Sequence, residues 1–124
     1  MTKQTILILL ALAGLIAPAS AQSIKGSGND DCGEWLQHRQ SVASRPPSLD
    51  RDLLLLNMEE SWIDGFISAI NATKVFSNAD LLAAHPGEGM YVWIDNYCRS
   101  KPLDNILTAS LALAIDLKAR AKRP

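Results

Sequence analysis

Two cysteines constrain the fold of this chain more than any other feature of its sequence. Cys32 and Cys98 are its only cysteines, and both follow an N-terminal segment with the character of a secretion signal. In an oxidising compartment, two cysteines most simply form one structural disulfide. Because the loop between them is long, the cross-link would stabilise the folded state by about 4 kcal/mol. We therefore expect a small exported domain braced by this disulfide.

Residues 1–21 carry the features of a cleavable signal peptide. Lys3 precedes an apolar run over residues 6–16, and the segment closes with Ala-Ser-Ala. The apolar run is well short of the ~20 residues that a membrane-spanning helix requires. We expect cleavage between Ala21 and Gln22, and a product without a membrane-spanning segment.

The rest of the chain has enough residues for one domain. Residues 22–31 are rich in Gly, Ser, Asn and Asp, and we interpret them as a flexible lead-in. Residues 32–118 carry a regular hydrophobic pattern and form the predicted helical domain. Residues 119–124 form a basic C-terminal tail, whose cations suit the end of a helix because of the helix dipole. An alternative is that these cations contact an anionic partner or a membrane surface.

Apolar residues recur at helical spacing through this domain, and no stretch has the alternation typical of a strand. The first predicted helix begins at Cys32, with Asp30 or Asp31 in position to cap it. It ends at the two prolines that follow Arg45, because proline disfavours helix at the residue before it.

The second predicted helix is capped by Ser48 or Asp50 and continues to Ile70. Gly65 lies in the middle of its pattern, where glycine costs about 1 kcal/mol relative to alanine. We interpret this glycine as a point where another helix approaches closely.

Residues 71–78 have the composition of a loop, and residues 79–84 that of one short helical segment. The Pro-Gly-Glu-Gly run at 86–89 breaks the chain before a third apolar stripe over 90–98. A last helix follows, with Pro102 among its early positions. The sequence therefore predicts an all-α fold, a small bundle of about four helices in which the disulfide joins the first to the penultimate.

The pattern Trp-Ile-Asp-x-aromatic occurs twice in the sequence. It begins at Trp62 and again at Trp93, and it ends at Phe66 and Tyr97. On a helix the first and fifth residues share a face, and two amphipathic helices with the same core stripe explain the repeat most simply. A functional alternative is that the central residues of the two motifs, Asp64 and Asp95, are pH-sensing acids, because burial disfavours the charged form of a carboxyl.

No group of residues in the sequence has the spacing of a catalytic or metal site. The adjacent Glu59 and Glu60 point in different directions on a helix, so we interpret them as a solvated face. His38 lies off the apolar stripe of the first helix and is expected at the surface. Two histidines and two cysteines lack zinc-binding spacing. The sequence therefore favours a protein that is not an enzyme and has no metal and no cofactor.

The charge balance excludes a nucleic-acid partner. The sequence has 12 Lys and Arg and 13 Asp and Glu. Cleavage after residue 21 would remove only Lys3, leaving 11 basic residues against 13 acidic ones. An exported chain with no excess of positive charge does not suit a polyanion. We expect a protein partner or unfolded client proteins.

One family resemblance accompanies these patterns. The run Cys-Gly-Glu-Trp-Leu at 32–36, the segment 65–71, and Ile94 and Cys98 before a last amphipathic helix resemble the HdeA/HdeB group. These are small helical proteins of the periplasm of Gram-negative bacteria, with one disulfide, which act as acid-stress chaperones. The chain is also similar, more weakly, to helical periplasmic immunity proteins that neutralise type VI secretion amidase effectors.

The resemblance implies a periplasmic protein whose helices loosen in acid and expose apolar faces to unfolded clients. It leaves open a homodimer at neutral pH, an immunity role that blocks a secreted effector, and a structural or interaction role in the envelope. The expected client or partner surface consists of the aromatic residues Trp35, Trp62, Phe66, Trp93 and Tyr97.

Overall fold

The computed structural model describes residues 23–44, 50–83 and 87–121. These residues form four α-helices and one short 3-10 helix, with no strand beyond an isolated bridge between Asp31 and Asn105. The prediction of a small all-α bundle is confirmed. The elements are η2 (Gly26–Asn29), α2 (Cys32–Ala43), α3 (Arg51–Thr73), α4 (Gly87–Ser100) and α5 (Ile106–Ala121).

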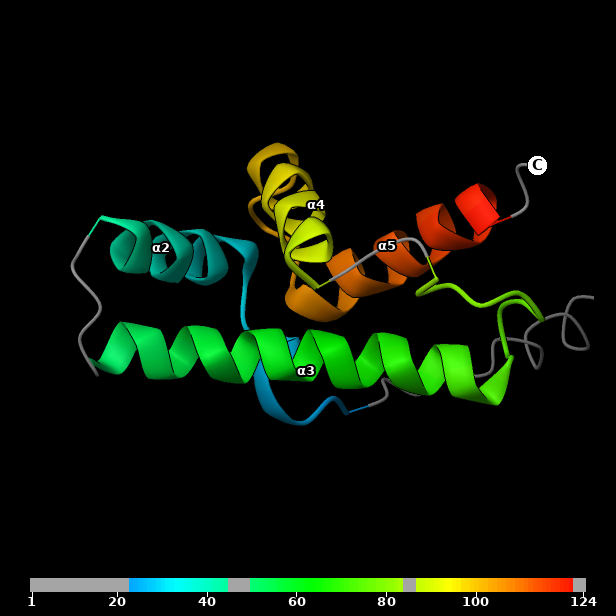
Figure 1. Cartoon of the computed structure of the whole chain (residues 1–124). Helices are drawn as coiled ribbons and strands as arrows, with labels where there is room; N and C mark the ends of the chain where they lie inside the picture. The colour runs from blue at the N-terminus through cyan, green and yellow to red at the C-terminus, as the bar shows by residue number, and fades with distance from the viewer. Residues whose placement is uncertain (1–22, 45–49, 84–86, 122–124) are drawn as a thin grey trace, which may run out of the picture.

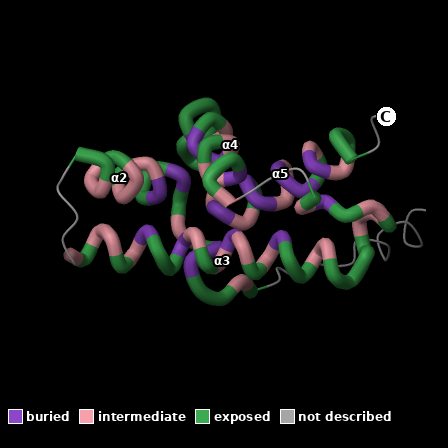
Figure 2. Tube along the Cα trace, viewed as in Figure 1, coloured by how far each residue is buried: buried purple, intermediate pink, exposed green. Residues whose placement is uncertain are grey.

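The helices α2 and α5 pack on the long helix α3, and α4 packs on α2 and α5. Figure 1 shows α2, α4 and α5 together on one side of α3. Helix α2 contacts α3 and α4, and α5 contacts the same two helices from the other end. Figure 2 shows that the buried positions of α2, α4 and α5 gather where these helices meet. The largest fully buried side chains of this core are Trp35, Ile63, Ile67, Leu81, Ile94, Ile106 and Leu113.

The predicted disulfide joins the first residue of α2 to the last third of α4. The Cα atoms of Cys32 and Cys98 are 4.9 Å apart, and neither residue is accessible to solvent. Two backbone hydrogen bonds reinforce this corner: the Cys32 N–H donates to the Asp104 carbonyl at 2.8 Å, and the Ile106 N–H to the Asp30 carbonyl at 3.0 Å. The N-terminal end of α2 is therefore fixed to the α4–α5 connection.

Side-chain caps explain where α2 and α3 begin. Asp31 accepts a hydrogen bond from the Glu34 N–H at 2.8 Å, and the Glu34 carboxylate reaches back to the Asp31 N–H, which completes a capping box. Asp50 caps α3 by accepting from the Leu53 N–H at 3.0 Å. The sequence analysis allowed two candidate caps for each of these helices. In the structure the cap is the residue directly before the helix, Asp31 for α2 and Asp50 for α3.

The start of the last helix differs from the prediction. Residues 101–105 form a connection, and α5 begins only at Ile106. Asn105 supplies the cap, because its side chain accepts from the Thr108 N–H at 2.9 Å. Pro102 therefore precedes the helix rather than lying inside its first turn.

Two further boundaries differ from the sequence analysis. Helix α3 continues to Thr73 and ends where Lys74 adopts a left-handed conformation, with φ of 56°. The segment 79–83 forms turns and no helix. Helix α4 begins at Gly87, so residues 87–89, which were expected to interrupt the helical pattern, belong to its first turn.

The segment expected to be a flexible lead-in contains η2, which packs under Trp62. A Cβ atom on Gly28 would lie 2.2 Å from Cζ2 of Trp62, so only glycine fits this contact. The Trp62 indole N–H donates to the Lys25 carbonyl at 3.1 Å. Gly26 has φ of 74°, which also favours glycine. Helix η2 thus lies against α3 and α5.

The ends of the chain lie partly outside the described residues. The expected signal segment 1–21 and the cleavage point between Ala21 and Gln22 fall there, as do residues 122–124. Residues 119–121, expected in a basic tail, belong to α5. Over the part of the chain that the structure describes, every helix is too short or too polar to cross a bilayer.

Candidate functional site

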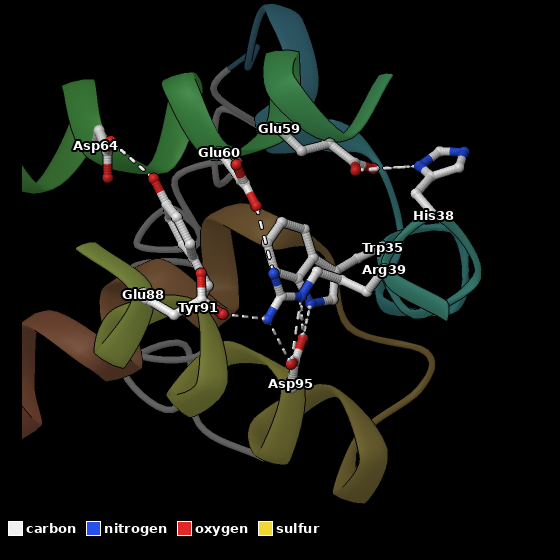
Figure 3. Close-up of polar contacts among 9 residues, drawn as sticks. All are labelled: Trp35, His38, Arg39, Glu59, Glu60, Asp64, Glu88, Tyr91 and Asp95. Carbon is white, nitrogen blue, oxygen red and sulfur yellow. Dashed lines mark hydrogen bonds and ion pairs between the residues drawn. The ribbon is translucent and has the colours of Figure 1, made fainter. Parts of the chain in front are cut away.

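A cluster of charged side chains lies where α2, α3 and α4 meet, and Figure 3 shows it in detail. Each helix contributes residues at helical spacing, so the contributors from one helix share a face. We call the central group the Arg39 network; it consists of Arg39 from α2, Glu60 from α3, and Glu88 and Asp95 from α4.

The guanidinium of Arg39 contacts all three carboxylates. Its Nη2 donates to Asp95 Oδ2 at 3.1 Å and to Glu88 Oε1 at 3.0 Å. Its Nε is 3.2 Å from Asp95 Oδ1, and its Nη1 is 3.4 Å from Glu60 Oε1. Since only 21% of the Arg39 side chain is exposed, these carboxylates replace much of the water that would otherwise solvate the cation.

Trp35 ties this network to the core. Its indole Nε1 donates to Asp95 Oδ1 at 2.7 Å, and the Arg39 guanidinium lies 5.6 Å from the centre of its ring. Trp35 itself is inaccessible to solvent, and Asp95 is 7% exposed. Asp95 therefore accepts hydrogen bonds from two side chains of α2, the neutral indole of Trp35 and the charged guanidinium of Arg39.

A second polar contact joins α2 to α3 beside the network. His38 Nδ1 is 3.0 Å from both carboxylate oxygens of Glu59. Glu59 is 1% exposed, and the His38 side chain 14%. The expectation that His38 lies at the surface and Glu59 on a solvated face is wrong, because each residue covers the other as α2 crosses α3.

Asp64 makes a third polar connection, between α3 and α4. The Tyr91 hydroxyl donates to Asp64 Oδ2 at 2.8 Å. Burial, followed by this hydrogen bond, raises the pKa of Tyr91 far above its ordinary value. The other carboxylate oxygen, Oδ1, is buried and has no hydrogen-bond partner among the described residues.

Burial changes the proton affinity of two glutamates in the cluster. It raises the pKa of Glu59, and the hydrogen bond and charge of His38 offset only part of that rise. It also raises the pKa of Glu60, against the opposing charge of Arg39. Burial lowers the pKa of Arg39, but hydrogen bonds to Asp95 and Glu88 outweigh this, so its pKa lies above the ordinary value. Arg39 stays a cation at every pH in which the protein is folded.

The aromatic residues expected to form one surface lie in three places. Trp35 is in the core. Trp62 and Phe66 are half-buried on α3 and stack with ring centres 5.2 Å apart. On α4, Trp93 and Tyr97 stack at 5.7 Å. In both copies of the repeated motif, the first and fifth residues pack together as their spacing predicts. Trp35 is therefore accessible only if α2 moves.

Sequence reasoning did not find the role of Arg39. The residue shares a helix face with Cys32 and Trp35, and an arginine on an otherwise apolar face indicates a buried counter-ion. Nothing local to α2 identifies Asp95 as that counter-ion, because the two residues are far apart in the sequence. Among the described residues, no three His, Cys, Asp or Glu side chains are placed to hold a metal ion.

A groove of about 710 Å³ runs beside the network, between α2 and α4. Leu36, Val42 and Leu56 give it apolar walls, and Arg39, Glu88 and Arg99 give it charge of both signs. An amphipathic segment has the chemistry to fit such a groove.

Comparison of the chain with protein-family models, with curated proteins and with solved structures finds no match in any of the three.

Proposed function

We propose that this chain is an exported periplasmic binding protein without catalytic activity, and that it acts as an acid-stress chaperone of the kind found in the HdeA/HdeB group. The observation that carries the proposal is the Arg39 network. It joins three helices, it covers a buried tryptophan, and all its anions are carboxylates that acid neutralises. Acid therefore acts directly on the contacts between α2 and the rest of the bundle.

At neutral pH the network stabilises the closed bundle. Asp95, Glu60 and Glu88 compensate the charge of Arg39, and the compensated cluster holds Trp35 under α4. In strong acid the three carboxylates bind protons, while the guanidinium keeps its charge. A partly buried cation without counter-ions is strongly destabilising, so α2 would separate from α3 and α4.

The two glutamates with raised pKa values act in the opposite direction. Because the folded state binds protons at Glu59 and Glu60 more tightly than the unfolded chain does, their contribution to stability increases as the pH falls through the raised pKa values. Protonation in mild acid therefore does not open the bundle through these residues. We expect the opening only in strong acid, at a pH where carboxyl groups in general are protonated.

The disulfide determines how far the bundle can open. Cys32 fixes the first residue of α2 to α4, whereas Arg39 holds the middle of the same helix. Loss of the network would free the C-terminal part of α2 to swing away while its start stays attached. This motion would expose Trp35 and the apolar walls of the groove, including Leu36 and Leu56, to unfolded clients. Charge repulsion among the basic residues would assist it.

Light scattering by a client protein that denatures at pH 2 tests the proposal. With the protein present, aggregation of the client should be suppressed at pH 2 and not at pH 7. The variant Asp95→Asn mimics the acid form of the central carboxylate, so it should show part of this suppression already at neutral pH. Asp116→Asn is the matched control, because it removes the carboxylate of an exposed ion pair with Arg120. Lack of suppression at pH 2 by the wild-type protein would sink the proposal.

The groove between α2 and α4 favours a second candidate, an immunity-type role. A preformed groove with apolar walls and charges of both signs suits the docking of one specific effector at neutral pH. This role predicts copurification of a single effector and a structure that does not respond to acid. Circular dichroism between pH 7 and pH 2 therefore separates the two candidates.

A further inference from the structure

The outer side of α5 has no charged residue along most of its length. Helix α5 packs on α3, α4 and η2, and the buried stripe that makes these contacts includes Ile106, Leu113 and Leu117. The residues on the opposite side of the helix are exposed or half-buried, and all of them are uncharged. We call this surface the outer face of α5. It consists of Thr108, Leu111, Ala112, Ile115 and Ala119.

Three large apolar side chains on or beside this face are open to water. Ile115 is 58% exposed in the third turn of α5, and Leu103 is 96% exposed in the connection before the helix. Val75 is 75% exposed and precedes Phe76, which lies beside Lys118 of α5. Exposed apolar residues therefore accompany α5 at its start, in its middle and at its end, and their transfer out of water is favourable.

A lysine lies over an aromatic ring at each end of α5. Before the helix, Lys101 Nζ is 5.3 Å from the centre of the Tyr97 ring. In the last turn, Lys118 Nζ is 5.9 Å from the centre of the Phe76 ring. Lysine and tyrosine each have an apolar body and a polar tip, so they are favoured where hydrocarbon meets water. Both ends of the helix therefore have side chains that suit the interface of a bilayer.

The charge of this part of the chain differs in sign from that of the rest. Residues 101–124 have five Lys and Arg and two Asp, whereas residues 1–100 have seven Lys and Arg and eleven Asp and Glu. Four of the five basic residues lie within 118–123, at the end of α5 and directly after it. A cluster of four or more Lys and Arg on an amphipathic helix is typical of proteins that bind anionic lipids.

The two aspartates of residues 101–124 are engaged within the molecule. Asp104 accepts a hydrogen bond from the Tyr97 hydroxyl at 2.6 Å. Asp116 pairs with Arg120, with the nitrogen and oxygen 2.6 Å apart. Even with both aspartates counted, the segment keeps an excess of basic residues. The attraction to an anionic surface is therefore not cancelled locally.

We propose that the outer face of α5 docks on the surface of a lipid bilayer that contains anionic phospholipids. The helix, about 24 Å long, would lie in the plane of the membrane. Leu103, Leu111 and Ile115 would enter the region of the acyl chains, and the lysines would stay at the level of the phosphates. A helix face is convex, and a bilayer adapts to it without a matching groove. This docking does not depend on the proposed function.

The docking should be weak and sensitive to salt. The inserted side chains are small compared with a myristoyl chain, which alone gives an association constant of roughly 10⁴ M⁻¹. Each Lys or Arg near an anionic surface adds roughly a fivefold increase in affinity. We therefore expect half of the protein to be bound at about 0.1–1 mM accessible lipid. Binding should fall steeply at roughly 0.5 M salt, because ions screen the attraction.

The outer side of α3 serves as a comparison surface. It also has exposed apolar residues, Leu54 and Met58, at 54% and 59% exposure. Its exposed residues from Leu54 to Thr73 are all uncharged, so it lacks the cations that accompany α5. A Cβ atom on Gly65 would meet no atom within 4 Å, so the close approach of another helix expected there does not occur among the described residues. Substitutions on this side provide matched controls.

Cosedimentation of the purified protein with large unilamellar vesicles at pH 7 tests the proposal. The protein should bind vesicles of phosphatidylcholine with about 30% phosphatidylglycerol at least about tenfold more tightly than vesicles of phosphatidylcholine alone. Lys101→Gln with Lys118→Gln removes two cations, so the dissociation constant for the anionic vesicles should rise at least about tenfold. Lys25→Gln with Arg51→Gln is the matched control, because it makes the same charge change at exposed positions outside α5.

A second pair of variants tests the apolar contribution. Leu103→Ser with Ile115→Ser should weaken binding to the anionic vesicles at least about fivefold. Both side chains are exposed, so circular dichroism and Tm should stay close to those of the wild type. Leu54→Ser with Met58→Ser removes equally exposed apolar residues from α3 and should leave binding unchanged.

Four outcomes would count against the docking. A wild-type protein that does not bind the anionic vesicles would overturn the proposal and assign the outer face of α5 to a protein partner. Equal binding to both kinds of vesicle, or equal loss in the variants and their controls, would also contradict it. Residues 1–22 are the same in all variants, so binding through the apolar run at 6–16 would survive the α5 substitutions, and that result would refute the proposal as well.

Quenching of a new tryptophan by brominated acyl chains tests the orientation. Leu103→Trp should add emission that brominated phosphatidylcholine in the anionic vesicles quenches, relative to the wild type. Leu54→Trp, on the other side of the bundle, should add emission that these lipids leave unchanged. Equal quenching of the two added signals would show that α5 does not face the bilayer.

Discussion

The strongest test of the Arg39 network is the substitution Asp95→Asn. Asparagine has nearly the same shape as aspartate, and its carbonyl oxygen can still accept the 2.7 Å hydrogen bond from Trp35. The substitution therefore removes one negative charge while it leaves packing in place. Arg39 then keeps only Glu60, at 3.4 Å, and Glu88, whose side chain is 71% exposed.

The expected loss of stability follows from these contacts. Removal of one partner of a fully buried ion pair costs about 3–5 kcal/mol, because the remaining charge is left uncompensated. Arg39 is 21% exposed and keeps two weaker partners, so a value of about 2–3 kcal/mol is appropriate here. That is a large part of the ~5–15 kcal/mol typical of a domain.

Urea denaturation followed by circular dichroism measures this loss. At pH 7 the unfolding midpoint of Asp95→Asn should fall by about 1–2 M relative to the wild type. At pH 2, which is below the ordinary pKa of a carboxyl group, the two proteins should have similar stability. The double variant with Arg39→Met should recover part of the stability at pH 7, since no buried cation remains.

Two results would refute this reasoning. A loss below about 0.5 kcal/mol at pH 7 would place Asp95 among ordinary surface ion pairs. A loss that is the same at pH 7 and pH 2 would show that the effect comes from packing and not from charge.

Three further predictions follow from other contacts. Gly28→Ala places a Cβ against the Trp62 ring and should destabilise the protein by about 1–3 kcal/mol, measured as a lower Tm. Glu59→Gln should be more stable than the wild type at pH 7, because burial raises the pKa of Glu59 and so disfavours its charged form. Urea titrations should show that this difference in the free energy of unfolding disappears as the pH falls toward 4.5. Reduction of Cys32–Cys98 should cost about 2–5 kcal/mol, seen as a fall in Tm on addition of dithiothreitol.

Local signals in the sequence were sufficient to predict the fold class. Apolar spacing indicates helices at α2, α3 and α4, and the cap residues Asp31 and Asp50 lie directly before two of them. The disulfide follows from the presence of only two cysteines. Each of these features depends on residues close together in the chain or on a simple pairing, so no knowledge of the tertiary structure is required.

The start of α5 and the polar cluster could not be predicted in the same way. Asn105 is a local cap for α5, but the hydrogen bond from the Ile106 N–H to the Asp30 carbonyl, which fixes the start of this helix to α2, exists only after the chain has folded. His38 and Glu59, taken singly, have the character of surface residues. Their burial depends on how α2 crosses α3, which no local pattern records.

The position of the disulfide also determines what a protease can do to this protein. Lys74 is exposed in the connection between α3 and α4, where a trypsin-like enzyme would find it accessible. A cut there leaves two fragments that Cys32–Cys98 still joins, so the nicked protein stays in one covalent piece until it is reduced. Release of α5 requires a cut after Cys98, and Lys101, the exposed basic residue in the connection between α4 and α5, is followed by Pro102, which blocks such enzymes. Arg99 is also exposed, but it lies in the last turn of α4. The protein therefore stays in one covalent piece after a cut at Lys74, and Pro102 protects the connection between α4 and α5 from a cut at Lys101.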